Sequence, residues 1–96
     1  MHVALICKDK PGHLQVRMDS RPAHVEFLNA LNAQGKLALA GPLVEDGNPM
    51  GSLVVLAVDT LEEAKALAAD DPYAKAGLFA EVEIRQWNWV FNAPGA

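Results

Sequence analysis

Two short runs of the sequence, residues 3–7 and 53–58, are apolar at every position. A strand in a sheet with one wet face alternates apolar and polar side chains, so an unbroken apolar strand predicts a sheet covered on both faces. The chain has 96 residues, which is the size of one compact domain. The groups that cover the two faces of the sheet must therefore come from this one small domain or from a partner.

The first helix is expected to begin at Ser20, a residue type that is common at helix N-caps. Pro22 then falls in the first helical turn, where its missing N–H would have no intrahelical partner. The helix is expected to end near Gln34, because Gly35 is typical of the left-handed residue that follows a helix. The preceding residues 14–18 are expected to form only a short turn.

The second half of the chain predicts two strands and then a helix. The strands are expected at residues 36–44 and 51–59, joined by a segment rich in Asp, Gly, Asn and Pro. Thr60 and Glu63 form a capping-box pattern, in which the Thr hydroxyl accepts from the backbone N–H of Glu63. A helix with an apolar stripe therefore follows Thr60.

The last strand is expected over residues 79–91, after a short turn that begins at Pro72. Its apolar positions change phase along the strand. A β-bulge near Arg85 or Gln86 would return the later aromatic residues to one face. Residues 92–96 are expected to form a loose tail.

The order strand, helix, strand, strand, helix, strand predicts an α+β fold for a single domain over residues 1–96. In a chain of this length it is typical of the ferredoxin-like βαββαβ arrangement, with two helices on one face of an antiparallel sheet. The helices can cover one face only. We expect a second copy to cover the other, sheet against sheet, in a homodimer. A large hydrophobic ligand or a different partner is the alternative.

Composition excludes several classes of function. The formal net charge is −4 and the eight Lys and Arg are scattered, which argues against nucleic-acid binding. No run approaches the roughly 20 apolar residues of a membrane span, and no signal peptide is recognisable, so a cytoplasmic protein is expected. The single cysteine excludes an internal disulfide framework. His2, His13 and His24 lack metal-ligand spacing, and no dinucleotide fingerprint is present, so neither metal nor cofactor is expected.

Two ionisable residues stand where helical spacing expects apolar ones. His24 heads the stripe of Phe27, Leu28 and Leu31, and Asp71 ends the stripe of Ala64, Leu67 and Ala68. Two helices side by side on one sheet could bring this pair together, and a carboxylate near a histidine is the usual arrangement for a general acid/base. The alternatives are a hydrogen-bonded structural histidine and an Asp71 that caps the turn after it.

Three further residues are candidates for substrate binding. Arg21 could clamp an anionic group or lie on the helix surface. Ser52 could donate to a ligand, although a hydroxyl that satisfies a turn is the commoner case. Tyr73 either packs in the core or lines a pocket.

Three short motifs resemble the YciI-like (YCII-related) family of small bacterial proteins: R-P-x-H at residues 21–24, G-P-L at residues 41–43 and D-P-Y at residues 71–73. The resemblance extends over nearly the whole chain. It implies a ferredoxin-like dimeric α/β-barrel with a cleft around a His–Asp pair, which corresponds here to His24 and Asp71. The G-P-L motif adds Gly41 to the substrate-binding candidates. One branch of the family is associated with dehydrochlorination of a chlorinated, hydroxylated ring.

These features support a first hypothesis, a cofactor-independent enzyme of the lyase or isomerase type. His24 would move a proton on a small organic substrate, and Asp71 would orient and stabilise the charged ring. The second hypothesis is a non-catalytic small-molecule-binding or regulatory module that uses the same cleft. The third is a purely structural dimer domain.

Overall fold

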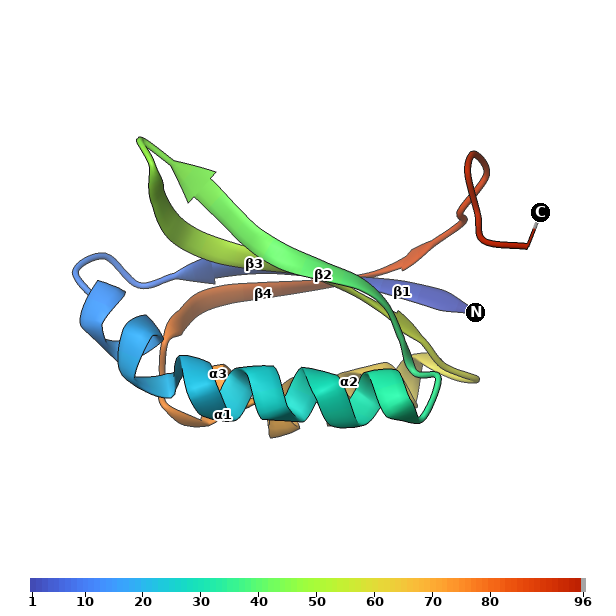
Figure 1. Ribbon diagram of the computed structural model, residues 1–96, viewed down its shortest axis with the longest axis horizontal. Helices are drawn as coiled ribbons and strands as arrows, with labels where there is room; N and C mark the ends of the chain where they lie inside the picture. Colours follow the sequence, from blue (N-terminus) through green and yellow to red (C-terminus); the bar gives the residue numbers. More distant parts are fainter. Residues whose placement is uncertain (96) are drawn as a thin grey trace.

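The computed structural model describes residues 1–95 and contains one antiparallel sheet with strand order β2-β3-β1-β4 (Figure 1). The elements in chain order are β1 (His2–Asp9), α1 (Leu14–Ala33), β2 (Leu37–Glu45), β3 (Asn48–Ala57), α2 (Leu61–Asp70), α3 (Pro72–Lys75) and β4 (Phe79–Trp87). The predicted α+β fold and βαββαβ order are confirmed, with α3 as a short addition before the last strand.

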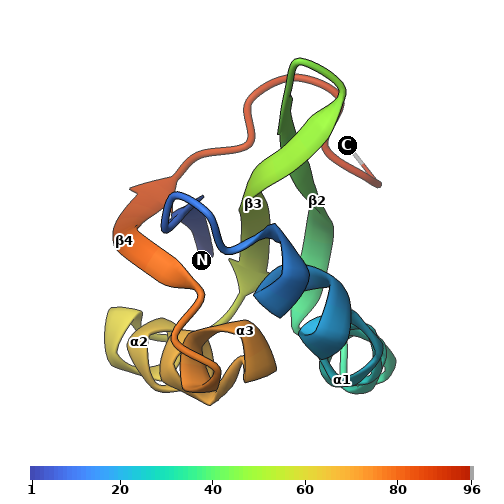
Figure 2. The same cartoon turned by 90° about the vertical axis from the view of Figure 1, so that its left-hand side faces the viewer.

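The helices lie on one face of the sheet, with α1 beside α2 and α3 (Figure 2). The core forms in this interface, where Val3, Leu5 and Cys7 of β1 join Val54 and Leu56 of β3. Val3 and Leu56 are fully buried, and burying one such side chain contributes about 1.5–3 kcal/mol. The apolar runs therefore supply the layer that holds both helices against the sheet.

The helix α1 begins at Leu14, not at Ser20, so the predicted separate turn is wrong. Pro22 lies inside this helix, where it removes one backbone hydrogen bond at a cost of about 3 kcal/mol. Ser20 is an interior residue and caps nothing. The turns before the proline are anchored by Arg17, whose buried contacts are described below.

The strand β4 is also shorter than predicted, ending at Trp87. Its irregularity lies at the opposite end from the predicted bulge near Arg85 and Gln86, because Lys8 pairs with Glu81 while Asp9 pairs with Phe79. Trp89 lies after the end of β4, so no bulge is needed to explain its position in the alternation of apolar residues. It packs instead near Trp87, with ring centroids 5.4 Å apart.

The two predicted strands, the turn between them and the following helix are confirmed as β2, β3 and α2. The turn is shorter than expected. Glu45 pairs with Asn48, and the intervening Asp46 and Gly47 have φ of 51° and 78°. Two successive positive φ values are typical of a type I′ hairpin turn. At the start of α2, the Thr60 hydroxyl accepts from the Glu63 N–H at 3.1 Å, as predicted.

The sheet face away from the helices is also apolar on its central strands. Ala4 and Ile6 of β1 pair with Val55 and Leu53 of β3, one residue out of phase with the core positions. Ile6 and Leu53 are half-buried in the single chain. What covers them stays a prediction, as do the single domain and the loose tail, whose last residue, Ala96, lies outside the described part.

Candidate active site

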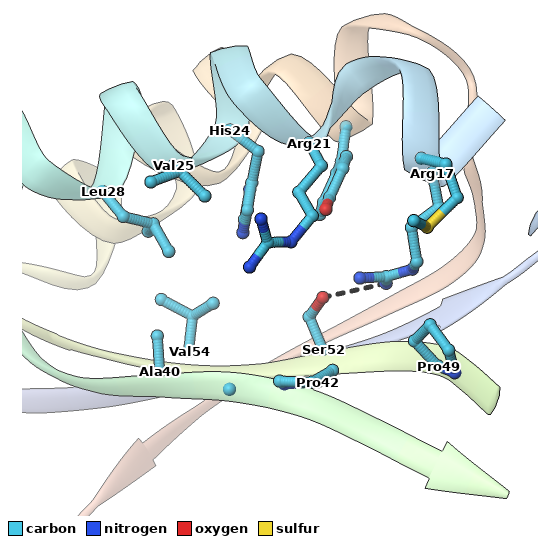
Figure 3. A pocket seen from close by; sticks show the side chains of 13 residues that line it. Arg17, Arg21, His24, Val25, Leu28, Ala40, Pro42, Pro49, Ser52 and Val54 are labelled. Atoms are coloured by element: carbon cyan, nitrogen blue, oxygen red, sulfur yellow. Dashed lines mark hydrogen bonds between the residues drawn. The ribbon is translucent and has the colours of Figure 1, made fainter. Parts of the chain in front are cut away.

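A cavity of about 370 Å³ lies between α1 and the strands β2 and β3 (Figure 3). This volume is within the range of small-molecule sites, about 300–1,000 Å³. Five of the six predicted site residues line it: Arg21, Gly41, Ser52, His24 and Tyr73. The sixth, Asp71, is not part of the lining and lies behind His24. The other lining residues are Arg17, Met18, Val25, Leu28, Ala40, Pro42, Pro49 and Val54.

His24 and Asp71 meet as the helical stripes predicted. His24 Nδ1 lies 2.9 Å from Asp71 Oδ1, and both residues are buried. The same carboxylate oxygen accepts from the Tyr73 N–H at 2.9 Å, so Asp71 also caps α3, with Pro72 next to it at the start of that helix. The two alternative roles considered for Asp71, partner of a histidine and N-cap, are thus both present in the structure.

The hydrogen bond to Asp71 assigns different roles to the two ring nitrogens of His24. A carboxylate oxygen is an acceptor, so Nδ1 is the nitrogen that donates in this bond. Nε2 is then the nitrogen left for a ligand. Figure 3 shows the His24 ring projecting from α1 into the cavity. This geometry suits a group that exchanges a proton with a bound molecule.

Tyr73 fixes the orientation of the His24 ring by stacking on it. The two ring centroids are 3.8 Å apart and the planes differ by 15°. Tyr73 is almost fully buried. Burial raises the pKa of its phenol, although the positive charges of Arg17 and Arg21 partly oppose the rise. The phenol therefore remains protonated at neutral pH and can serve as a hydrogen-bond donor in the cavity.

Arg17, which sequence reasoning missed, forms a second buried ion pair at the cavity wall. Its Nε donates to Asp9 Oδ2 at 2.6 Å, and its Nη2 donates to Asp9 Oδ1 at 2.8 Å and to Ser52 Oγ at 2.9 Å. Burial lowers the pKa of Arg17, but hydrogen bonding and the charge of Asp9 outweigh burial and raise it. Arg17 is thus a permanent positive charge, with only 4% of its surface exposed.

A helical signal could have located Arg17. In an uninterrupted α1, Arg17, Arg21, His24 and Leu28 follow one another at spacings of four, three and four residues, which places them on one face. Treating Pro22 as part of a first turn left Arg17 outside the helix and hid this row. Asp9 carried no comparable signal, since it is an acidic residue at the end of a strand.

Ser52 lies inside β3 and not in a turn, so the expectation that its hydroxyl satisfies a turn is wrong. It is paired across the sheet with Cys7 and is buried. The preceding Gly51 allows this close approach, because a Cβ there would overlap the backbone carbonyl oxygen of Cys7. Gly41, by contrast, is an exposed residue of β2 whose Cβ position is open space.

The remaining ionisable groups do not extend the site. Cys7 is buried in the core, and burial, reinforced by the charge of Asp71, raises the pKa of its thiol to about 12. Within residues 1–95, no three His, Cys, Asp or Glu side chains gather closely enough to hold a metal ion. No helix in this part of the chain is long and apolar enough to cross a membrane. A site that needs no cofactor stays a prediction.

The fold and the site define a small α+β protein with a buried His–Asp pair at a ligand-sized cavity. The chain belongs to the YCII-related domain family, whose family model matches residues 1–88. It is 35% identical to Protein YciI of Escherichia coli over 98 aligned positions, covering 95% of this chain and all of that protein. An uncharacterised protein of Haemophilus influenzae matches with the same identity and coverage. The predicted membership of this family is confirmed.

The chain is also similar to the solved structure of an enzyme. It is 5-chloro-2-hydroxyhydroquinone dehydrochlorinase (TftG) from Burkholderia phenoliruptrix, in complex with 2,5-dihydroxybenzoquinone. The two chains superpose with a TM-score of 0.83 and 33% sequence identity, covering 92% of this chain and 94% of the dehydrochlorinase.

Proposed function

We propose that this protein is an enzyme that moves a proton on a small hydroxylated ring, with His24 as general acid/base and Asp71 as the group that orients and stabilises it. The observation that carries the proposal is the 2.9 Å contact between the two side chains at the wall of a 370 Å³ cavity. The similarity to a dehydrochlorinase bound to a dihydroxybenzoquinone supports the choice of substrate class.

The proposed step needs only a base that can become an acid. Nε2 of His24 takes a proton from a ring hydroxyl and returns one to a ring carbon. Where that carbon carries chlorine, chloride leaves with the bonding electrons and a second hydroxyl proton goes to solvent. The ring is oxidised to the quinone level while the carbon–chlorine bond is reduced, so no outside oxidant is required. Proton transfer by a positioned side chain contributes about 10²–10⁴-fold to a rate.

The lining of the cavity suits a flat ring with polar substituents. Val25 and Leu28 project from α1 toward Ala40 and Val54 on the strands, so apolar side chains border the space from both sides (Figure 3). Polar groups are few and placed at separate points, as in most small-molecule sites. An apolar slot also excludes water, which strengthens hydrogen bonds to a bound substrate.

The test is turnover of hydroxylated rings by the protein and two histidine variants. Chloride release from 5-chloro-2-hydroxyhydroquinone is measured together with hydrogen–deuterium exchange at ring carbons of unchlorinated hydroquinones, followed by NMR in D₂O. His24→Gln should abolish both reactions. His13→Gln is the matched control and should retain them, because it alters a half-buried histidine that does not line the cavity and whose ring nitrogen contacts the Pro11 carbonyl. Saturable binding with no exchange and no chloride release would contradict the enzyme and favour a binding module.

We also propose that a second copy covers the sheet face opposite the helices. Support comes from Ile6 and Leu53, which are half-buried in the single chain and lie on the two inner strands beside the buried Ala4 and Val55. A closed dimer buries the same patch on both chains. Sedimentation equilibrium at micromolar concentration should give about twice the mass of one chain, and Ile6→Glu should lower it to one. A wild-type monomer would contradict the proposal.

A further inference from the structure

We infer that the cavity takes hydroxylated rings that carry a short alkyl chain, and that aliphatic side chains beside His24 bind this chain. We call these side chains the apolar subsite: Val25, Leu28, Ala40 and Val54. The inference rests on the proposed function, because it names a substituent of the ring taken by the same cavity. It also assigns a role to a part of the lining that the proton-transfer step does not use.

The polarity of the cavity changes along its length. On α1, the two arginines of the lining precede His24, and Leu28 follows it by about one helical turn. On the facing strand β3, Ser52 is followed two residues later by Val54. Figure 3 shows the aliphatic side chains gathered around the His24 end of the space, away from Arg17. Both walls therefore change from polar to apolar in the same direction.

The side chains of the apolar subsite cannot form hydrogen bonds. All four are aliphatic, and two of them, Ala40 and Val54, lie opposite each other in the β2–β3 ladder. A hydroxyl or carboxylate placed between them would lose its water without gaining a side-chain partner, which costs free energy. Aliphatic carbon gains free energy from the same transfer. The chemistry of these walls therefore favours an alkyl substituent over a polar one.

The length of the subsite favours a chain of several carbons over a single atom. His24 and Leu28 are four residues apart on α1, which is about 6 Å of helical rise. Roughly four carbon–carbon bonds of about 1.5 Å each have that length. The cavity of about 370 Å³ is also in the range of sites that hold drug-sized ligands. A bare dihydroxylated ring is smaller than such ligands, so a ring without a chain would leave part of the space unfilled.

The subsite has a fixed inner wall and an open outer side. Val54 is 3% exposed and pairs with Leu5 of the core strand β1, and Leu28 packs against the core. On the outer side, Val25 is 36% exposed, and Ala40 is exposed on the edge strand β2. A short chain would thus lie on a preformed apolar wall. The outer carbons of a longer chain would pass between Val25 and Ala40 into solvent.

Ala40 is the specificity-determining residue of the apolar subsite, because it has the smallest side chain of the four. Figure 3 shows it on β2, facing Val25 and Leu28 across the space. A leucine at this position would extend toward α1 and occupy the volume that an alkyl chain needs. Since Ala40 is exposed on an edge strand, this larger side chain does not have to fit into the packed core.

The experiment measures how affinity depends on chain length, by titration calorimetry at pH 7. The probes are 2,5-dihydroxybenzoquinone and its 3-methyl, 3-propyl and 3-hexyl derivatives. Each buried methylene should tighten binding about 4-fold, so the propyl ring should bind at least about 10-fold more tightly than the methyl ring. The hexyl ring should bind within about 3-fold of the propyl ring, because carbons that stay in water add little. Equal affinities for the methyl and propyl rings, or no binding of any probe, would overturn the inference.

Three variants locate the bound chain. Ala40→Leu should lower the ratio of the propyl to the methyl affinity to about 1, because the chain no longer fits. Val25→Ser, at an exposed position of the facing helix, should lower the ratio to about 3 or less and serves if Ala40→Leu folds poorly. Val44→Leu alters an exposed residue of β2 outside the cavity lining and should keep the wild-type ratio. A folded Ala40→Leu protein with the wild-type ratio would mean that the chain binds elsewhere, and would overturn the inference.

The same measurements separate this inference from the proposed function. Turnover of hydroxylated rings by a wild type whose affinity does not rise with chain length would remove the inference alone. A rise with chain length that Ala40→Leu cancels, without turnover by wild type, would remove the proposed enzyme and leave a binding site for alkylated rings.

Discussion

The two ends of the cavity are built on the same plan and differ in one property. At each end a cationic or basic side chain of α1 contacts a buried carboxylate from another part of the chain: His24 with Asp71, and Arg17 with Asp9. Asp71 binds a single nitrogen of an imidazole, a side chain that can act as both proton acceptor and proton donor. Asp9 binds two nitrogens of a guanidinium, which cannot. The first pair is suited to proton transfer and the second to fixed charge.

The difference also separates the energetic roles of the pairs. A neutral His24 needs no counter-charge, and Asp71 keeps a second hydrogen bond from Tyr73 N–H. Arg17 is always charged, so it and Asp9 each compensate the other's burial. Removing one member of such a pair leaves an unpaired buried ion. The His end should therefore tolerate substitution in folding, and the Arg end should not.

The largest expected effect is on turnover of a hydroxylated ring. His24→Gln should lower kcat by about 10²–10⁴-fold, because it removes the group that moves the proton. Arg17→Lys should instead act mainly on KM, raising it by about 10–100-fold, because binding is weakened in the ground state as well. Steady-state kinetics of both variants separates the two parameters. Equal losses of kcat would show that the two ends do not divide the work as described.

The next effect is on stability. Arg17→Ala should lower the free energy of unfolding by about 3–5 kcal/mol, because it strands the Asp9 carboxylate, whose side chain is 8% exposed. His24→Ala should cost less, about 1–3 kcal/mol, from lost packing and one hydrogen bond. Urea unfolding of both variants at pH 7 gives the comparison. If His24→Ala proved the more damaging, His24 would be chiefly a structural residue.

The two ends of the cavity could not be predicted equally well from the sequence. His24 and Asp71 each interrupt an apolar stripe, and helical spacing carries that signal locally. Placing both helices on one sheet then brought the two residues together. Arg17 is 8 positions from Asp9 and 35 positions from Ser52 in the sequence, so no local pattern predicts these contacts. The only local indication was the position of Arg17 on the same face of α1 as His24, and it depended on where α1 begins. Pro22, about two turns into the helix, concealed that start, since tertiary contacts outweighed the usual preference of proline for the first turn.

The sheet, too, could be predicted only in part from the sequence. Strand order followed from turn residues and apolar runs, and Asp46 and Gly47 lie within the predicted turn. The bulge was misplaced because the phase change in the last strand was attributed to a defect near Arg85. The strand instead ends at Trp87 and pairs irregularly at Phe79. Apolar periodicity reports which side chains are buried, and it does not say whether a buried aromatic residue is still in a strand.

A smaller effect should come from changing the charge of Asp71 without its shape. Asp71→Asn keeps an oxygen that can cap α3, so stability should fall by less than about 1 kcal/mol. Turnover should still fall, by about 10–100-fold, because the amide cannot stabilise a protonated His24. Asp71→Ala should add a stability loss of about 1 kcal/mol from the missing cap. Unfolding and rate measurements on both variants check the split. An Asn variant with full activity would reduce Asp71 to a cap.

The smallest expected effect concerns Cys7, which lies on β1 opposite Ser52. The charges of residues from both ion pairs affect the pKa of its thiol. Burial raises the pKa of its thiol to about 12, from 9.0 in the absence of the fold; Asp71 adds to the rise, Arg17 opposes it and Asp9 adds again. The folded state therefore holds a proton that the unfolded chain loses above about pH 9. This contribution to stability is fully present below pH 9 and is lost as the pH rises toward 12.

Cys7→Val tests this directly, because it keeps an apolar side chain in the core and removes the titrating group. Urea unfolding at pH 8.0 and pH 10.5 should show wild type losing more stability than the variant over that interval. Tyr73, whose pKa is also raised by burial, contributes a slope of the same sign in both proteins, so the difference isolates the thiol. Identical slopes would mean that the thiol ionises as readily in the folded protein as in the unfolded chain. The space between the two pairs would then be wetter than the 3% exposure of Cys7 indicates.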